Sequence, residues 1–271
     1  MFNPLGLLTG DAASHGIETG TAFPLAGGSV AFSMIETLTA GPGRIDSAYA
    51  PAADLPAAVS TLAAPRPPFA GIDISRPVVM GVVNVTPDSF SDGGDFFDVD
   101  RAIDHALRLA DEGATIIDIG GESTRPGADP MSVADEIDRV LPIVEAVLAQ
   151  GVTVSVDTRR SAVMRAVIEA GAQIINDITA LTDDPEAPGV VAASDASVVL
   201  MHMQGTPETM QQAPVYRLAS HDIFNWLAAR VDICVAAGIP LGRIAVDPGI
   251  GFGKTDTHNM EILQRVGAFH G

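Results

Sequence analysis

From residue 76 onward the sequence alternates short apolar runs with longer amphipathic stretches, and this alternation constrains the fold more than any other feature. Six runs have the length and β-branched content of buried strands: 78–83, 115–119, 152–156, 173–176, 197–201 and 243–247. Most intervening stretches have helical spacing, although Pro142 should kink its helix or mark a late start. The pattern predicts an α/β fold, a (β/α)8-type barrel with about six strand–helix units present.

Polar residues stand where several of these runs end. Asp157 directly follows the third run, Asn176 closes the fourth and Asp247 closes the sixth. Barrels place their active sites at the carboxyl ends of the strands, so these side chains are expected to meet in one site. The alternative for any single such aspartate is a cap on the next helix.

Two polar loops rich in glycine follow the first two runs. Residues 84–94 read NVTPDSFSDGG, and residues 120–127 read GGESTRPG. Glycine permits mobility and a close approach of backbone to a ligand. A rigid turn without a ligand is the alternative for the first loop, and an ordinary surface ion pair is the alternative for Arg125.

Five segments, in this order, resemble the dihydropteroate synthase family, the folate-pathway enzymes that sulfonamides inhibit. They are PVVMGVVNVTPDSFSDGG (77–94), IIDIGGESTRPGA (116–128), VSVDTRRSAVMRAVIEAGAQIINDITAL (154–181), VVLMHMQGTPETM (198–210) and AVDPGIGFGKT (245–255). The resemblance covers residues 76–271 and makes them a pterin-binding barrel domain.

The resemblance implies a transferase reaction. The family joins 6-hydroxymethyl-7,8-dihydropterin pyrophosphate to p-aminobenzoate, which forms a C–N bond and releases pyrophosphate. With Mg²⁺ assistance the reaction is SN1-like, because the pterin ring delocalises the cation left behind. Catalysis is then mostly positioning and electrostatics.

The resemblance also assigns roles to individual residues. Catalysis is expected to involve Asn84, Asp88, Thr124 and Arg125, and Asn84 is expected to face the Mg²⁺ ion. The pterin is expected to contact Asp157, Asn176, Met201, Asp247 and Gly251. The p-aminobenzoate is expected to contact Phe90, Thr124, Arg125, Pro126 and Phe252.

Two other patterns are weaker. Residues 249–255 are similar in sequence to a nucleotide-binding P-loop, but that motif needs glycine at the position of Pro248. His202 lies between two methionines with no second His or Cys at a ligand spacing, which favours a structural histidine.

The family pattern continues with two further strands, which end in a Ser-Arg-Lys and an Arg-x-His motif. The sequence to Gly271 has neither, so we expect a barrel that is incomplete at its C-terminus. The alternatives to an active synthase are an inactive fragment, a pterin-binding subunit completed by a partner, and a pterin-dependent methyltransferase. The two loops favour the synthase.

Residues 1–75 read as an N-terminal extension and linker. They are rich in Ala, Gly, Pro and Thr, and Pro65–Pro68 is typical of an extended linker. The segment Phe23 to Leu38 could hold one short strand or helix. We expect the extension to pack on the barrel or on a neighbouring subunit.

Charge and cysteine content limit the partners. The formal net charge of −19 argues against nucleic acid and anionic membranes, and no targeting or spanning segment is recognised. The single cysteine, Cys234, cannot form an intrachain disulfide and should be buried, which fits a cytoplasmic protein. The expected partners are the two small-molecule substrates and, by resemblance, a second copy in a homodimer.

Overall fold

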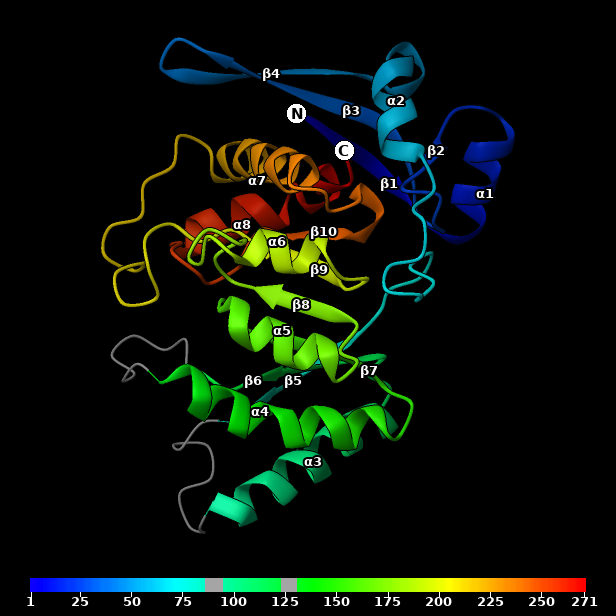
Figure 1. The fold of residues 1–271 in the computed structure, drawn as a ribbon. Coiled ribbons are helices and arrows are strands. Elements are labelled where there is room, and N and C mark those ends of the chain that lie inside the picture. The colour runs from blue at the N-terminus through cyan, green and yellow to red at the C-terminus, as the bar shows by residue number, and fades with distance from the viewer. Residues whose placement is uncertain (86–94, 123–130) are drawn as a thin grey trace. The chain divides into compact units, whose positions relative to one another are not determined.

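The computed structural model describes residues 1–85, 95–122 and 131–271 (Figure 1). The chain divides into two compact units. The first unit comprises Met1–Pro77, Gln211–Ala229 and Ile250–Gly271, and the second comprises Val78–Met210 and Arg230–Gly249. The domain boundary expected near residue 75 stays a prediction.

The second unit is built on a parallel sheet. Its strands are β5 (Met80–Asn84), β6 (Ile116–Gly120), β7 (Thr153–Asp157), β8 (Ile174–Asp177), β9 (Ser197–Met201) and β10 (Ile244–Asp247). Their order in the sheet, β10-β9-β8-β7-β6-β5, follows the order of the chain. This is the strand order of a (β/α) barrel, so the expected fold class is confirmed.

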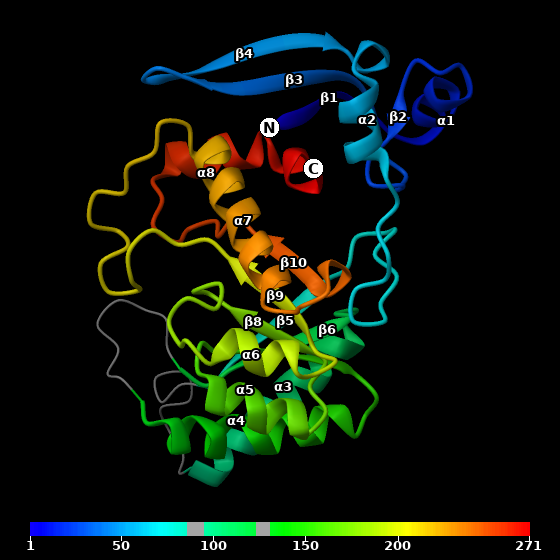
Figure 2. The ribbon, with the colours of Figure 1, turned by 45° about the horizontal axis from the view of Figure 1, so that its top comes forward.

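Helices cover the outer face of this sheet (Figure 2). They are α3 (Asp95–Asp111), α4 (Val133–Leu148), α5 (Ser161–Glu169) and α6 (Ala187–Ala192). The core between strands and helices includes Val83, Ile119, Val144 and Val156. Alternate strand residues point to this core, which leaves the other face free to carry polar groups.

Two local expectations have clear outcomes in the second unit. Helix α4 runs through Pro142 and starts at Val133, where the Ser132 hydroxyl accepts a hydrogen bond from Asp135 N at 3.1 Å. A late start at the proline is therefore wrong, because Ser132 already caps the helix. Cys234, in α7 (Ala219–Ala236), is fully buried as expected.

The first unit contains an antiparallel sheet. It consists of β1 (Phe2–Leu8), β2 (Phe23–Pro24), β3 (Ala31–Gly41) and β4 (Arg44–Pro51), in which β3 pairs with all three of the others. The single short element expected between Phe23 and Leu38 understates this structure, since that segment holds β2 and most of β3.

The first unit also contains short helices. They are α1 (Gly10–Glu18), η1 (Ala52–Asp54), α2 (Pro56–Ala63), α8 (Asp256–Leu263) and η4 (Val266–His270), while η3 (Leu241–Arg243) precedes β10 in the second unit. Phe32 and Ile35 of β3 pack with Leu62 of α2 in the core. Among the described residues no helix has the length and apolarity needed to cross a membrane.

A buried carboxylate connects this sheet to the C-terminal segment of the same unit. Glu36 in β3 is 2% exposed. Arg265, between α8 and η4, donates from Nε and Nη2 to the two oxygens of Glu36 at 2.9 and 3.1 Å. Asn3, Ser47 and Tyr49 donate to the same carboxylate at 2.8, 3.3 and 3.2 Å. The charge is therefore fully hydrogen-bonded, as a buried ion pair requires.

Candidate active site

The strand register places several expected site residues on one face of the sheet. Asn84, Gly120, Asp157 and Asn176 lie directly opposite one another along β5 to β8. Paired residues of parallel strands project to the same side, so the three polar side chains share the face opposite the helices. They also share the carboxyl end of the sheet, where barrels bind their ligands.

Gly120 is closely flanked by polar side chains within this row. A Cβ atom at position 120 would lie 3.2 Å from Asn84 Oδ1 and 3.6 Å from Asp157 Oδ2. The amide of Asn84 and the carboxyl of Asp157 therefore flank the same point on the glycine backbone. A side chain here would press on the Asn84 amide, so glycine allows the two polar groups to lie close to one another.

The next two strands extend the same face. Asn176 pairs with Val199, and Val199 pairs with Ala245. Met201 and Asp247 lie two residues further along their strands and are paired with each other, so they project to the same side. Five expected residues thus lie on one face and at one end of the sheet: Asn84, Asp157, Asn176, Met201 and Asp247.

The end of β10 is held by local contacts. Asp247 Oδ1 accepts a hydrogen bond from Gly249 N at 2.7 Å, and Asp247 O accepts one from His202 N at 2.9 Å. Gly249 has φ +67°, and a side chain there would collide with the carbonyl of His202. The turn after β10 therefore requires glycine and fixes the direction of the Asp247 carboxyl.

Burial changes the acidity of this site. Burial raises the pKa of Asp157 well above its ordinary value, and the charges of Asp118, Asp177, Glu136 and Glu122 raise it further. Burial also raises the pKa of Asp118. Carboxyl groups crowded in a poorly solvated site are stabilised by a ligand that donates N–H hydrogen bonds.

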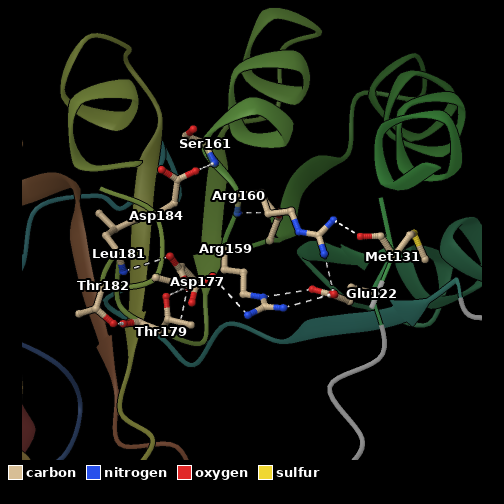
Figure 3. Close-up of polar contacts among 12 residues, drawn as sticks. Glu122, Met131, Arg159, Arg160, Ser161, Asp177, Thr179, Leu181, Thr182 and Asp184 are labelled. Atoms are coloured by element: carbon tan, nitrogen blue, oxygen red, sulfur yellow. Dashed lines mark hydrogen bonds and ion pairs between the residues drawn. The ribbon is translucent and has the colours of Figure 1, made fainter. Parts of the chain in front are cut away.

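Two arginines after β7 form a network with acids at the end of β6 and in α4 (Figure 3). Arg160 pairs with Glu122 at 2.8 Å and with Glu136 at 3.3 Å, and it donates to Met131 O at 2.6 Å. Arg159 pairs with Glu122 at 3.2 Å. Arg160 thus joins residues on both sides of 123–130 to the carboxyl end of β7.

Asp177, which faces the helices, organises the turn after β8 (Figure 3). Its carboxylate accepts hydrogen bonds from Thr179 N and Oγ1, both at 2.7 Å, and from Leu181 N at 3.0 Å. Ala180 and Leu181 have φ of +55° and +60°, which costs a non-glycine residue conformational energy. Arg230 donates to the carbonyls of these two residues at 2.6 and 2.8 Å, so both ends of the strained pair are held.

Asp177→Ala should lower the free energy of unfolding by about 2–3 kcal/mol, because three hydrogen bonds to a buried charge are lost and the strained turn is released. Urea denaturation measures this loss. Thr179→Val removes one of the three bonds and should cost about 1 kcal/mol. Equal losses in the two variants would show that Asp177 does not hold the turn.

Other expected residues lie elsewhere. Five of them fall outside the described residues: Asp88, Phe90, Thr124, Arg125 and Pro126. Gly251 and Phe252 belong to the first unit. There Gly251 has φ +85°, its N donates to Asn259 Oδ1 at 3.0 Å, and its O accepts from Gln211 Nε2 at 2.7 Å.

Sequence reasoning missed Asp118 and the two arginines. Asp118 stands inside an otherwise apolar strand, and a charge in such a run is a signal that could have been used. Arg159 and Arg160 follow a strand-end aspartate, but their sequence does not reveal which acids they meet.

The residues present can be tested against a metal ion. Within residues 1–85, 95–122 and 131–271, no three His, Cys, Asp or Glu side chains gather as a metal-binding group. Asn84 is exposed and ends β5 beside Gly120. One amide oxygen suits Mg²⁺, which keeps several waters and substrate phosphates as ligands.

Comparisons with known proteins agree with this geometry. Residues 80–271 match the family described as pterin binding enzyme. Dihydropteroate synthase of Escherichia coli K12 is 46% identical over 200 residues, which cover 73% of this chain and 71% of that protein.

Solved structures give the same result. The dihydropteroate synthase of Yersinia pestis with a sulfonamide drug complex is 47% identical, with a TM-score of 0.68, and the match covers 73% of this chain and 72% of that one. The Xanthomonas albilineans enzyme in complex with 7,8-dihydropteroate is 43% identical, with a TM-score of 0.63 and coverage of 72% and 68%.

Proposed function

Because this chain belongs to the pterin-binding enzymes, we propose that it acts as a dihydropteroate synthase in folate biosynthesis. It condenses 6-hydroxymethyl-7,8-dihydropterin pyrophosphate with p-aminobenzoate to give 7,8-dihydropteroate and pyrophosphate. The observation that carries the proposal is the set of polar side chains at the carboxyl ends of β7, β8 and β10, Asp157, Asn176 and Asp247, on one face of the sheet.

These three side chains suit the pterin ring. The ring offers an amino group, ring N–H groups and a carbonyl, and it needs acceptors and an amide to meet them. Asp157 and Asn176 lie side by side in the register, and Met201 adds a buried apolar group on the same face. A site with paired donors and acceptors of this kind rejects analogues that leave its polar groups unpaired.

The second substrate is assigned to the loops. On the family resemblance, Thr124 and Arg125 approach the pyrophosphate and the p-aminobenzoate, while Phe90, Pro126 and Phe252 surround the aminobenzoate ring. Asp88 joins them in catalysis, and Gly251 allows the backbone near the pterin. Exclusion of water matters here because water would trap the pterin cation as a hydrolysis product.

Asn84 is the residue of this chain that would hold Mg²⁺. Its exposed amide lies at the strand end beside Gly120, which is compatible with an ion that keeps water and phosphate ligands. Bound there, Mg²⁺ would neutralise charge on the leaving pyrophosphate. The homodimer and the cytoplasmic location implied by the resemblance stay predictions.

A coupling assay on the purified chain tests the proposal. The chain receives dihydropterin pyrophosphate, p-aminobenzoate and Mg²⁺, and dihydropteroate and pyrophosphate are measured together. Equimolar formation of both products supports the synthase. Saturable pterin binding without turnover would favour a pterin-binding subunit, and methyl transfer from methyltetrahydrofolate to a cobalamin carrier would favour a methyltransferase.

Asn84→Ala should raise the Mg²⁺ concentration for half-maximal rate by about tenfold or more, because the amide ligand is lost. Asn84→Asp keeps an oxygen at this position and should retain Mg²⁺ dependence near that of the wild type. Steady-state rates at increasing Mg²⁺ measure both variants. The same Mg²⁺ dependence in Asn84→Ala and the wild type would remove Asn84 from the metal site.

A further inference from the structure

Asp118 lies one layer beneath the row of strand-end residues. It stands in β6 two residues before Gly120, directly opposite Val82 of β5 and Ser155 of β7. Because side chains alternate along a strand, Asp118 shares the face that carries Asn84, Asp157 and Asn176. It is 3% exposed, so it supports this row from below and has little access to solvent.

Asp118 makes one hydrogen bond with direct consequences for the site. Asn176 Nδ2 donates to Asp118 Oδ2 at 3.0 Å. An ionised carboxylate can accept hydrogen bonds but cannot donate them, so it selects the nitrogen side of the amide. The Oδ1 atom of Asn176 is then turned away from Asp118.

The surroundings of Asp118 argue against a purely structural role, because a carboxyl group at this position lowers the stability of the fold. Asp118 Oδ1 and Ser155 Oγ are both buried, and the two residues are paired in the register. Burial raises the pKa of Asp118 more than Ser155 and Asn176 lower it. A buried acid whose charge has no cationic partner among its hydrogen-bonded neighbours destabilises a fold, and an apolar side chain of similar size would destabilise it less. Costs of this kind are typical of functional sites.

We propose that Asp118 is a positioning residue for the pterin, which holds the Asn176 amide in one orientation so that Oδ1 faces the ligand as an acceptor beside Asp157. The inference rests on the proposed function and deepens it, because it states how the site distinguishes N–H donors from acceptors on the ring. Asp118 acts through Asn176 and does not itself touch the substrate.

Asp118→Asn tests this role without a change in size. An amide at position 118 can present either oxygen or nitrogen to Asn176, so the orientation of the Asn176 amide is no longer selected. We expect the dissociation constant for 6-hydroxymethyl-7,8-dihydropterin, measured by calorimetry on the full chain, to rise about tenfold. The KM for p-aminobenzoate and the thermal midpoint should not worsen, since a buried charge has been removed.

Asn176→Ala provides the decisive control. If Asp118 acts through Asn176, adding Asp118→Asn to Asn176→Ala should weaken pterin binding no further. Ser155→Ala, in the same layer, should change the dissociation constant by less than about twofold. Asp118→Leu, which removes the acceptor with another side chain of similar size, should reproduce the loss if Asp118→Asn fails to fold.

Three results would overturn the inference. The first is an unchanged pterin affinity in Asp118→Asn. The second is a loss of pterin affinity on adding Asp118→Asn to Asn176→Ala that equals its loss in the wild type. The third is a KM for p-aminobenzoate that rises in Asp118→Asn as much as the pterin dissociation constant does. Failure of the wild-type chain to bind the pterin would instead overturn the proposed function, so the two failures are distinguishable.

Discussion

Asp157→Asn should lower kcat/KM for the pterin substrate by about 10²–10³-fold and leave the protein at least as stable as the wild type. An amide in place of the carboxyl presents a donor where the pterin also donates, so the bound ring would leave buried groups unpaired. Steady-state kinetics with both substrates measures the first effect, and thermal unfolding measures the second.

The stability of this variant should depend on pH in a defined direction. Burial and the neighbouring acids raise the pKa of Asp157 above the ordinary value of 3.8. Between the ordinary and the raised pKa, the folded chain binds more protons than the unfolded chain, so this group lowers stability as pH rises. The advantage of Asp157→Asn should therefore grow as pH rises through this range and then level off.

Asp195→Asn is the matched control, because Asp195 is an exposed aspartate of the same unit. It should leave kinetics unchanged and shift stability by less than about 0.5 kcal/mol. An Asp157→Asn variant with wild-type kcat/KM would remove Asp157 from the pterin site. An Asp157→Asn variant that is less stable than the wild type at neutral pH would show that the Asp157 carboxylate stabilises the fold.

The inner strands of the second unit, β6 to β9, were predictable because both faces are covered over much of their length. Runs such as 78–83 and 197–201 are nearly continuous in apolar residues, and runs such as 152–156 and 173–176 end at or just before a polar residue. For that reason the amino-acid pattern alone places Asp157, Asn176 and Asp247 at strand ends. The pattern does not show that these three side chains share one face of the sheet. That depends on the strand register, which is set by pairing between segments far apart in the chain.

Contacts across the site could not be predicted in this way. The bond from Asn176 to Asp118 joins residues 58 positions apart, and nothing local in either segment specifies the other. The same holds for Ala180 and Leu181, whose positive φ values depend on Asp177 in their own turn and on Arg230 from a distant helix. Sequence reasoning identified the groups, and packing determined their partners.

The antiparallel sheet of the first unit was missed for a related physical reason. The inner strand, β3, has no regular alternation of buried and exposed residues, since Phe32 and Ile35 are buried while Ser33 and Met34 between them are partly exposed. Its stabilising ion pair joins Glu36 to Arg265, which are 229 positions apart. A period-two search therefore finds no strand, and a search for nearby charges finds no partner.

Arg265→Met should lower the free energy of unfolding of the first unit by about 3–5 kcal/mol at neutral pH, because it leaves the Glu36 carboxylate buried without its cation. Burial by itself would raise the pKa of Glu36, but the hydrogen bonds from Arg265, Asn3 and Tyr49 outweigh burial and hold that pKa below its ordinary value of 4.5. The ion pair therefore contributes its full stability at pH values above the ordinary pKa of Glu36. This contribution is lost as the pH falls through the lowered pKa of the folded state. The gap between wild type and variant should narrow on acidification, and urea denaturation at pH 7 and below pH 4 measures it.

Arg44→Met offers a matched surface control for this loss. Arg44 pairs with Asp46 at 2.7 Å, but its side chain is 75% exposed, so the variant should lose less than about 1 kcal/mol. Glu36→Gln combined with Arg265→Met removes both charges and should recover part of the stability that Arg265→Met alone loses. If the double variant were as unstable as the sum of the single variants, the loss would come from packing of the arginine side chain, and the buried charge on Glu36 would not be its cause.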